Sequence, residues 1–482
     1  MKKIFSLCLL LFSINALACT GFLAGKDVTV DNSMIFARNE DLQGVNPKKF
    51  MVVKSREYKK GEIFENPDTG FKWPYPKYAL KHTLVPDADP SYGVFGEAGT
   101  NELGVSVSAT VSANANDKIL ALDPYVEGGL TEPDIASLVL MQAKTARHAV
   151  EIVANIVEKA GAGEGNIIIF GDKNEMWYME IYTGHQYVAV KVPTDVYAVI
   201  PNAFYLGSYD FTSKDVIASK DIQNLPEKNG LAKTLNDKFH LALTYREIHS
   251  KYNVDRIAMG QNHFCPLLPV EHDSEIAYEL FRKPDKKISV KEVMNFLRDR
   301  YEGSDYDVDT PENKGKIRPI GTDTNLEAHI FQIRDNAPTV MWLAMGTVEH
   351  SVFVPYYEYI TKTHKSYIAD ADEFNRDSMY WAMKGLHILA REDRMRYGLG
   401  VRTYWDKVEN DFISKLKEED KIINSKKGKD KINYANNLGL MKAEQVKKDA
   451  DMMFDKLIYF KGTMTDMALQ GKKKDAKFEF KK

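Results

Sequence analysis

The sequence predicts an α+β protein in which antiparallel strands pack against helices. Three features lead to this prediction: β-rich runs broken by turn residues up to about residue 120 and again after 165, an amphipathic segment at 131–160, and helical periodicity from 371 onward. The strands after 165 follow one another as in an antiparallel meander, so we expect a sheet with helices against it.

The chain opens with a leader. It starts with the basic letters MKK, and the apolar run 4–14 is too short to span a bilayer comfortably, which is typical of a signal peptide. Ala16 and Ala18 fit the small-x-small cleavage pattern, so the mature chain would begin at Cys19. The alternative is a lipoprotein with its lipid on that thiol, but such sites usually carry Leu where this chain has Ala16. We expect an exported protein, periplasmic or extracellular.

The composition excludes several classes of protein. A net charge of −3 argues against nucleic-acid binding, and no later stretch approaches the length of a membrane helix. Of three cysteines, Cys8 leaves with the leader, so a disulfide framework is ruled out. Cys19 and Cys265 could pair with each other. If Cys19 acts as a nucleophile they do not, and Cys265 is then a buried apolar thiol.

The secondary structure is predicted segment by segment. The stretch "CTGFLAGKDVTVDNSMIFARNED" forms two strands around a turn near 26–31, and residues 131–160 form one or two helices that begin at a Thr-Glu-Pro cap. Residues 225–300 are expected to be mainly helical, 317–360 to return to strands, and the chain from 371 to be helical. The lysine-rich end "GKKKDAKFEFKK" predicts a solvated helical tail.

Two motifs that resemble ligand sites are better explained otherwise, and a third kind of site lacks its motif. "GAGEGN" at 161–166 precedes a strand and lacks a Lys-Ser/Thr pair, so it is a turn and not a phosphate loop. Residues 305–310, "DYDVDT", have calcium-loop spacing but lack the glycine and glutamate of an EF-hand, which leaves only a looser ion site open. The eleven histidines show no His-Glu-x-x-His spacing.

Cys19, at the predicted cleavage site, is a candidate nucleophile. A thiol is a good nucleophile only as thiolate, and most cysteine enzymes use a histidine to take its proton. An N-terminal cysteine has its own α-amine, with a pKa of about 7.7 to 8.0 beside a thiol near 8.5, so the amine can accept that proton. Cleavage before Cys19 would therefore create the catalytic base.

The predicted N-terminal hairpin brings two charged residues to this thiol. A hairpin centred near 26–31 would lay Arg38 opposite Cys19, so that Arg38 and Asp41 flank the sulfur. A guanidinium nearby favours thiolate, and a carboxylate can hold the ammonium in place.

These residues fall within a set of motifs that resembles a known family. "CTGF…ARNED", "TNELGVSVSATVS", "VIPNAF", "YNVDRIAMGQ" and "HIFQIRDNAPTVMWLAMG…SVFVP" resemble, in order, the motifs of the secreted dipeptidase family of N-terminal-nucleophile hydrolases. Cholylglycine hydrolases and penicillin V acylases are related to that family. The resemblance extends from Cys19 to about Tyr357.

The resemblance implies a four-layer αββα sandwich. The hydrolase domain would then cover 19–360, after the leader at 1–18 and before a helical C-terminal extension at 361–482. It also implies five active-site residues: Cys19, Arg38, Asp41, Asn202 and Arg256. Cys19 would be the nucleophile, Asn202 would polarise the scissile carbonyl, and Arg256 would hold the nucleophile region together. We assign no chemistry to Asn39, treat Asn101 and Glu102 as turn formers, and give Arg334 a packing or cleft role.

The sequence departs from the related amidases at one position. Where those enzymes carry an asparagine or tyrosine that completes the oxyanion hole, this chain has Thr110 and Val111, and a backbone N–H could serve instead. We therefore expect a cysteine dipeptidase that acts on short peptides and needs no cofactor or metal. A hydrolase of N-acyl amides and a lipid-anchored, non-catalytic binding protein are the alternatives. The resemblance also allows a homo-oligomer. The aromatic-rich "SVFVPYYEYI" could line an interface, but we expect it to lie in the core.

Overall fold

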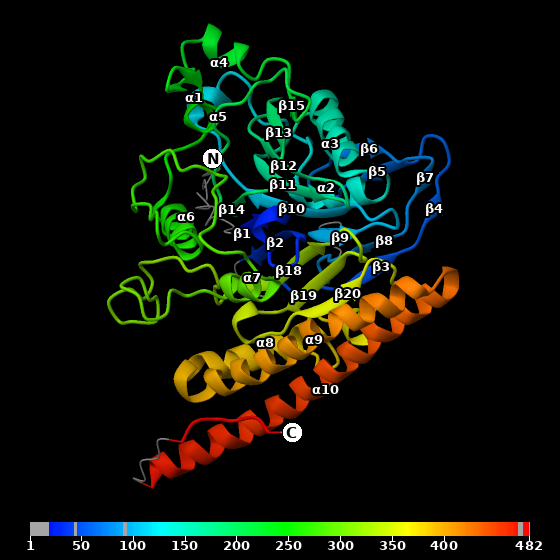
Figure 1. Cartoon of the computed structure of the whole chain (residues 1–482), viewed down its shortest axis with the longest axis vertical. Helices are drawn as coiled ribbons and strands as arrows, with labels where there is room; N and C mark the ends of the chain where they lie inside the picture. The colour runs from blue at the N-terminus through cyan, green and yellow to red at the C-terminus, as the bar shows by residue number, and fades with distance from the viewer. Residues whose placement is uncertain (1–18, 43–45, 90–93, 471–475, 482) are drawn as a thin grey trace, which may run out of the picture.

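Two antiparallel sheets lie face to face in the computed structural model, which describes residues 19–42, 46–89, 94–470 and 476–481 (Figure 1). The expected leader at 1–18 lies outside these residues. The first sheet has the strand order β14 (Tyr197–Ile200), β1 (Thr20–Ala24), β2 (Met34–Asp41), β18 (Asn325–Ile333), β19 (Val340–Met345) and β20 (Val354–Tyr357). The second has the order β15 (Val216–Ala218), β13 (Tyr187–Lys191), β12 (Met176–Ile181), β11 (Asn166–Gly171), β10 (Ser106–Ser112) and β9 (Ala98–Thr100).

The inner faces of the two sheets form the main core. A Cβ atom added to Gly171 of β11 would lie 2.7 Å from ring atoms of Phe36 and 2.7 Å from the side chain of Ile333, both on the first sheet. The alternate residues of β11 then point the other way, so Ile167 and Ile169 belong to the inter-sheet core while Ile168 belongs to a second core.

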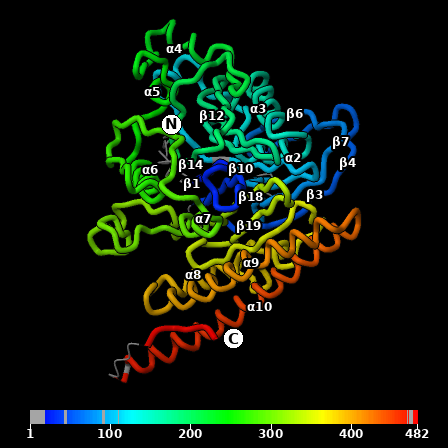
Figure 2. The backbone as a smooth tube through the Cα atoms, in the orientation of Figure 1, coloured from blue at the N-terminus to red at the C-terminus, as the bar shows by residue number. Residues whose placement is uncertain are grey.

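Helices cover the outer faces of both sheets. The second core joins β11 and β12 to α2 (Glu132–Leu140) and α3 (Ala146–Ala160). On the first sheet, α6 (Lys251–Phe264) and α7 (Val290–Leu297) pack on β1, where the ring of Phe22 lies 5.0 Å from that of Phe264 and 5.5 Å from that of Phe296. The predicted four-layer αββα sandwich is confirmed, with the N-terminal hairpin at its centre (Figure 2).

Capping residues fix where the helices begin. The segment predicted as one or two helices is two: Thr131 and Asp134 form a capping box for α2, and Thr145 Oγ1 accepts the backbone N–H of His148 at the start of α3. The expectation that 225–300 is mainly helical is wrong. Four helices, α4 (Asn224–Lys228), α5 (Leu241–Tyr245), α6 and α7, cover less than half of this stretch, and the rest is irregular chain and a short strand pair.

Short elements complete the described chain. They are the strand pairs β3 (Met51–Val53) with β8 (His82–Leu84), β4 (Arg56–Glu57) with β7 (Tyr78–Ala79), β5 (Ile63–Glu65) with β6 (Lys72–Pro74), β16 (Thr234–Leu235) with β17 (Lys238–Phe239), the helix α1 (Asp117–Leu120), and the 3-10 turns η1 (Lys26–Val28), η2 (Val348–His350), η3 (Lys365–Tyr367) and η4 (Arg391–Asp393).

The C-terminal region forms a helical layer below the first sheet. It comprises α8 (Met379–Ala390), α9 (Leu399–Ser425) and α10 (Gly428–Leu469), and the segment η5 (Arg394–Gly398) between α8 and α9 is a π-helical turn. Helix α10 runs the length of this layer beside β20 (Figure 1). Within the described residues, every helix is too short or too polar to cross a lipid bilayer.

The end of the chain differs from the solvated helical tail that the sequence predicts. Residues 476–481 are not helical, and the rings of Phe478 and Phe480 are buried against the helical layer. The ring of Phe480 lies 4.7 Å from that of Tyr404 in α9, and the backbone N–H of Phe478 donates to Arg396 O at 2.7 Å. The lysines of this tail therefore flank two apolar anchors.

The close approach of the two sheets predicts a stability test. Gly171→Ala forces a Cβ into the space of Phe36 and Ile333, so we expect the free energy of unfolding to fall by about 1–3 kcal/mol. Gly462→Ala is the matched control, because no atom lies within 4 Å of its added Cβ in α10. That substitution should stabilise the helix by up to ~1 kcal/mol. Urea unfolding of both variants measures the difference, and equal midpoints would contradict the packing.

Candidate active site

Cys19 lies directly before β1, between the two sheets, and its side chain is only 3% exposed. The added Cβ of Gly21 would face Val111 of the second sheet at 3.5 Å, and Cys19, two residues earlier, shares that face. The sequence placed Arg38 opposite Cys19, and this register is wrong. Arg38 pairs with Gly21, because the turn is centred one residue further along the chain than expected.

Arg38 nevertheless lies beside the thiol, on the inner face of β2. Its guanidinium donates to Ala109 O on the second sheet and to the carboxylate of Glu97, and Glu132 Oε1 lies 3.6 Å from Nη2. Burial opposes the charge of Arg38, but Cys19, Glu97 and Glu132 outweigh it and raise the pKa of the guanidinium well above its usual value. Arg38 therefore stays positively charged, and its hydrogen bonds hold it in place near the sulfur of Cys19.

A buried cluster of carboxylates behind Arg38 is neutralised by Lys48. Lys48 Nζ lies 2.6 Å from Glu40 Oε1 and 3.1 Å from Glu97 Oε1, and it also binds Asp87. Burial raises the pKa of Glu40 well above its usual range. Although burial also opposes ionisation of Glu97, Lys48 and Arg38 lower the pKa of its carboxyl. The pKa values of these two carboxyls are therefore shifted in opposite directions, and the lowered one belongs to Glu97, which contacts Arg38.

Asp41 and Asn39 point to the opposite face of β2 from Arg38. Asp41 accepts hydrogen bonds from Arg318 Nη2 at 2.8 Å, from Thr322 Oγ1 at 3.0 Å and from the side chain of Asn325. Asn39 Nδ2 donates to the backbone oxygens of 297 and 320, which is a structural role. Arg38 and Asp41 therefore approach the nucleophile from different faces of the strand and do not flank it on one face.

Arg256 ties the nucleophile to Asn202. Its Nη1 donates to Cys19 O at 2.5 Å and to Thr20 Oγ1 at 3.0 Å, while Nη2 donates to Asn202 Oδ1 at 2.9 Å and to Asn253 Oδ1 at 2.7 Å. Asn253 and Arg256 stand three residues apart on α6, so both reach the same point. Asn202 Nδ2 in turn donates to Ser112 O at 2.8 Å, at the end of β10. The structure brings Cys19, Asn202 and Arg256 together, and the roles that the resemblance implies for them stay predictions.

The pKa of the thiol reflects this enclosed setting. Burial raises the pKa of Cys19 to about 12, against the lowering effect of Arg38, and the charge of Glu132 raises it further. In the full-length chain the nitrogen of Cys19 is an amide, bonded to Ala18, and has no basic lone pair. Such a thiol is almost entirely protonated at neutral pH.

Sequence reasoning missed the carboxylates and the lysine that surround Arg38. Glu132 begins α2 and accepts a hydrogen bond from Ser112 Oγ at 3.0 Å, which places it beside both Arg38 and the strand end that Asn202 binds. Lys48 and Glu97 come from irregular segments that carry no motif. Their only sequence feature is charge next to buried strands, and surface charges share that feature.

The other residues singled out from the sequence have structural roles. Asn101 is a turn former, since its Oδ1 accepts the N–H groups of 103 and 105, and Glu102 accepts from the N–H of residue 81. Arg334 binds Asp420 of α9, far along the sheet, so its role is packing. Cys19 and Cys265 are both free thiols. The side chain of Thr110, where the second oxyanion donor was in question, lies outside the part of the chain that the structure describes.

Two groups of side chains among the described residues converge closely enough to hold a metal ion. One is Glu40, Asp87 and Glu97, where Lys48 already supplies the positive charge; the other is Glu349, His350 and His387. The aspartates of 305–310 are not among these groups, and Asp309 pairs with Arg300 and Arg394.

Comparison with known proteins identifies the family to which this chain belongs. The sequence pattern of Peptidase family C69 matches residues 18–407. The chain is 38% identical over 423 residues to Probable dipeptidase B of Streptococcus pyogenes serotype M3, covering 84% of each chain. It is 33% identical to Probable dipeptidase of Latilactobacillus sakei, covering 77% of this chain and 80% of that one. Probable dipeptidase of Salmonella dublin is 34% identical, covering 74% of this chain and 85% of its own.

A solved structure of a conjugated bile acid hydrolase variant from Clostridium perfringens covers 70% of this chain and 92% of its own at 14% identity, with a TM-score of 0.31. That likeness is too weak to carry an argument. The family pattern begins one residue before Cys19 and includes all five predicted active-site residues. This chain, with its buried cysteine between two sheets, belongs to peptidase family C69.

Proposed function

We propose that this chain is an exported cysteine dipeptidase whose nucleophile is Cys19 after cleavage of the Ala18–Cys19 bond. The observation that carries the proposal is the contact of Arg256 with both Cys19 O and the Asn202 amide, beside a thiol that already has Arg38 as its cation. The names of the relatives support dipeptides as substrates. The apolar leader supports export, as in the sequence argument above.

The mechanism uses the terminal amine as the base. The amine takes the proton of the Cys19 thiol, and the sulfur attacks the carbonyl carbon of the scissile bond. Asn202 Nδ2 carries two hydrogens, so it can donate to Ser112 O and also to the developing oxyanion. The ammonium then returns a proton to the leaving amine, and water activated by the free amine releases the acyl group from the sulfur.

Removal of the sulfur tests the nucleophile. Cys19→Ala should lower dipeptide turnover by at least about 10⁴-fold while leaving the unfolding midpoint nearly unchanged. Cys265→Ala is the matched control, because it removes the other buried thiol and should keep full activity. Release of free amino acids from dipeptides is the measurement, run beside an N-acyl amide to separate the two substrate classes. Turnover retained in Cys19→Ala would exclude this mechanism.

Cleavage of the leader should increase the reactivity of the Cys19 thiol. With a pKa of about 12, roughly one thiol in 10⁴ is ionised at pH 8 in the full-length chain. We expect iodoacetamide to alkylate Cys19 at least about 10²-fold faster in a chain that begins at Cys19, where a free amine can take the proton. Peptide mass spectrometry with a time course gives both rates. Equal rates would show that the terminus is not the base, and a lipid on the sulfur would favour an anchored protein.

Arg256→Lys tests the link between Cys19 and Asn202. A lysine keeps the charge but cannot present a planar fork to the acceptors on Cys19, Asn202 and Asn253, so we expect kcat/KM to fall roughly 10²-fold. Arg147→Lys, at an exposed pair with Glu151, is the control and should be neutral. Kinetics on one dipeptide suffice, and parallel behaviour of both variants would argue against a positioning role.

A further inference from the structure

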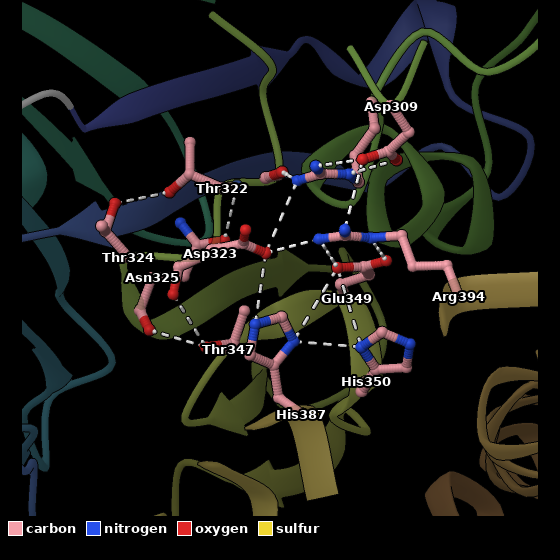
Figure 3. A network of polar contacts seen from close by, with 12 residues as sticks. Asp309, Thr322, Asp323, Thr324, Asn325, Thr347, Glu349, His350, His387 and Arg394 are labelled. Carbon is pink, nitrogen blue, oxygen red and sulfur yellow. Dashed lines mark hydrogen bonds and ion pairs between the residues drawn. The ribbon is translucent and has the colours of Figure 1, made fainter. Parts of the chain in front are cut away.

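Two buried histidines and a glutamate converge where the first sheet meets the helical layer (Figure 3). Glu349 and His350 are adjacent in η2, directly after β19, and His387 comes from α8. His350 Nδ1 lies 3.0 Å from His387 Nδ1, and Glu349 Oε2 lies 3.7 Å and 3.8 Å from these two nitrogens. His350 is 2% exposed and His387 is fully buried.

The spacing of these three atoms matches the size of a metal ion. A point equidistant from the three lies about 2.0 Å from each. Zinc bonds to histidine nitrogen and carboxylate oxygen measure about 2.0–2.2 Å. A hydrogen bond between the two histidines accounts for their own separation, but it does not require Glu349 Oε2 to be equally distant from both nitrogens.

The surrounding groups orient the ligands in the way that metal sites do. His387 Nε2 faces Asp323 Oδ1 at 3.2 Å, so its proton belongs on Nε2, and Nδ1, which lies 3.0 Å from His350 Nδ1, keeps a lone pair for a metal. Arg394 holds both oxygens of Glu349: Nε donates to Oε1 at 2.7 Å, and Nη2 donates to Oε2, the proposed ligand atom, at 3.1 Å.

Charged groups surround the three ligands and fix their positions. Three carboxylates, from Asp309, Asp323 and Glu349, meet two guanidiniums, from Arg300 and Arg394. The guanidinium of Arg402 and the ammonium of Lys384 also act on the two histidines. In the other candidate cluster, Lys48 Nζ already lies among the three carboxylates.

We propose that Glu349, His350 and His387 bind one divalent transition-metal ion of the zinc class, with water as a further ligand. The ion joins η2 on the sheet side to α8 on the helical side. The site is structural, since Cys19 chemistry does not involve it. His387 faces Asp323, which follows Thr322 in the chain, and Thr322 donates a hydrogen bond to Asp41. The bound ion therefore also stabilises the loop that holds Asp41 in place.

Metal binding to the full chain tests the proposal. All variants carry Cys19→Ala, so that the nucleophile cannot capture the metal. After incubation with ZnCl₂ and gel filtration, elemental analysis should find one zinc per chain, and Zn²⁺ at a hundredfold excess over Kd should raise Tm by about 3 °C. Co²⁺ should give visible d–d absorption without a thiolate charge-transfer band.

Matched variants decide which residues hold the ion. Glu349→Gln keeps a side-chain oxygen for Arg394 and should fold, yet it should retain less than a tenth of the zinc; His387→Ala should lose it entirely. His364→Gln is the control, because His364 is also mostly buried and paired with a glutamate, 2.7 Å from Glu444. That variant should bind one zinc. A parent chain without zinc, or zinc retained in Glu349→Gln, would overturn the proposal and leave the dipeptidase mechanism untouched.

Discussion

Charged side chains buried between the two sheets determine how the candidate active site is built. Arg38 is buried between the sheets, where an unpaired charge costs several kcal/mol. Glu97 and Glu132 pair with the guanidinium of Arg38, and Lys48 pairs with the carboxylates that Arg38 does not balance. Each of these buried charges therefore needs another as its partner. The packing of the two sheets brings all of them together at once.

The same enclosure explains how much of the site the sequence could predict. Cys19, Asn202 and Arg256 lie in recognisable motifs, and the structure joins them through the guanidinium of Arg256. Lys48 and Glu97 lie in segments with no pattern, and only tertiary structure brings them together. A charge that serves a buried partner has no periodicity to distinguish it from a solvated one.

The fold could be predicted where the apolar periodicity is strong. The prediction failed where the conformation of a turn sets the register of the strands. The strands of both sheets and the helices α2 and α3 have clear apolar repeats, whereas the register of the N-terminal hairpin depends on the turn itself. That turn contains η1 and Asn32 in the left-handed region, with φ of 57°, so it is longer than a simple hairpin connection. Residues 265–289 carry polar and apolar letters without a helical run, and tertiary contacts hold them as irregular chain.

The connection between α8 and α9 limits how this region can vary. Asp393 has an extended backbone, with φ of −148° and ψ of 92°, so α8 and α9 are separate helices joined by the turns η4 and η5. Trp405, Phe412 and Leu416 of α9 are buried. Because each helical residue turns the chain by about 100°, the loss of one residue between 390 and 399 would rotate these side chains away from their packing partners or break the connection. Gaps in an alignment of related chains should therefore avoid this stretch even where its residues change freely.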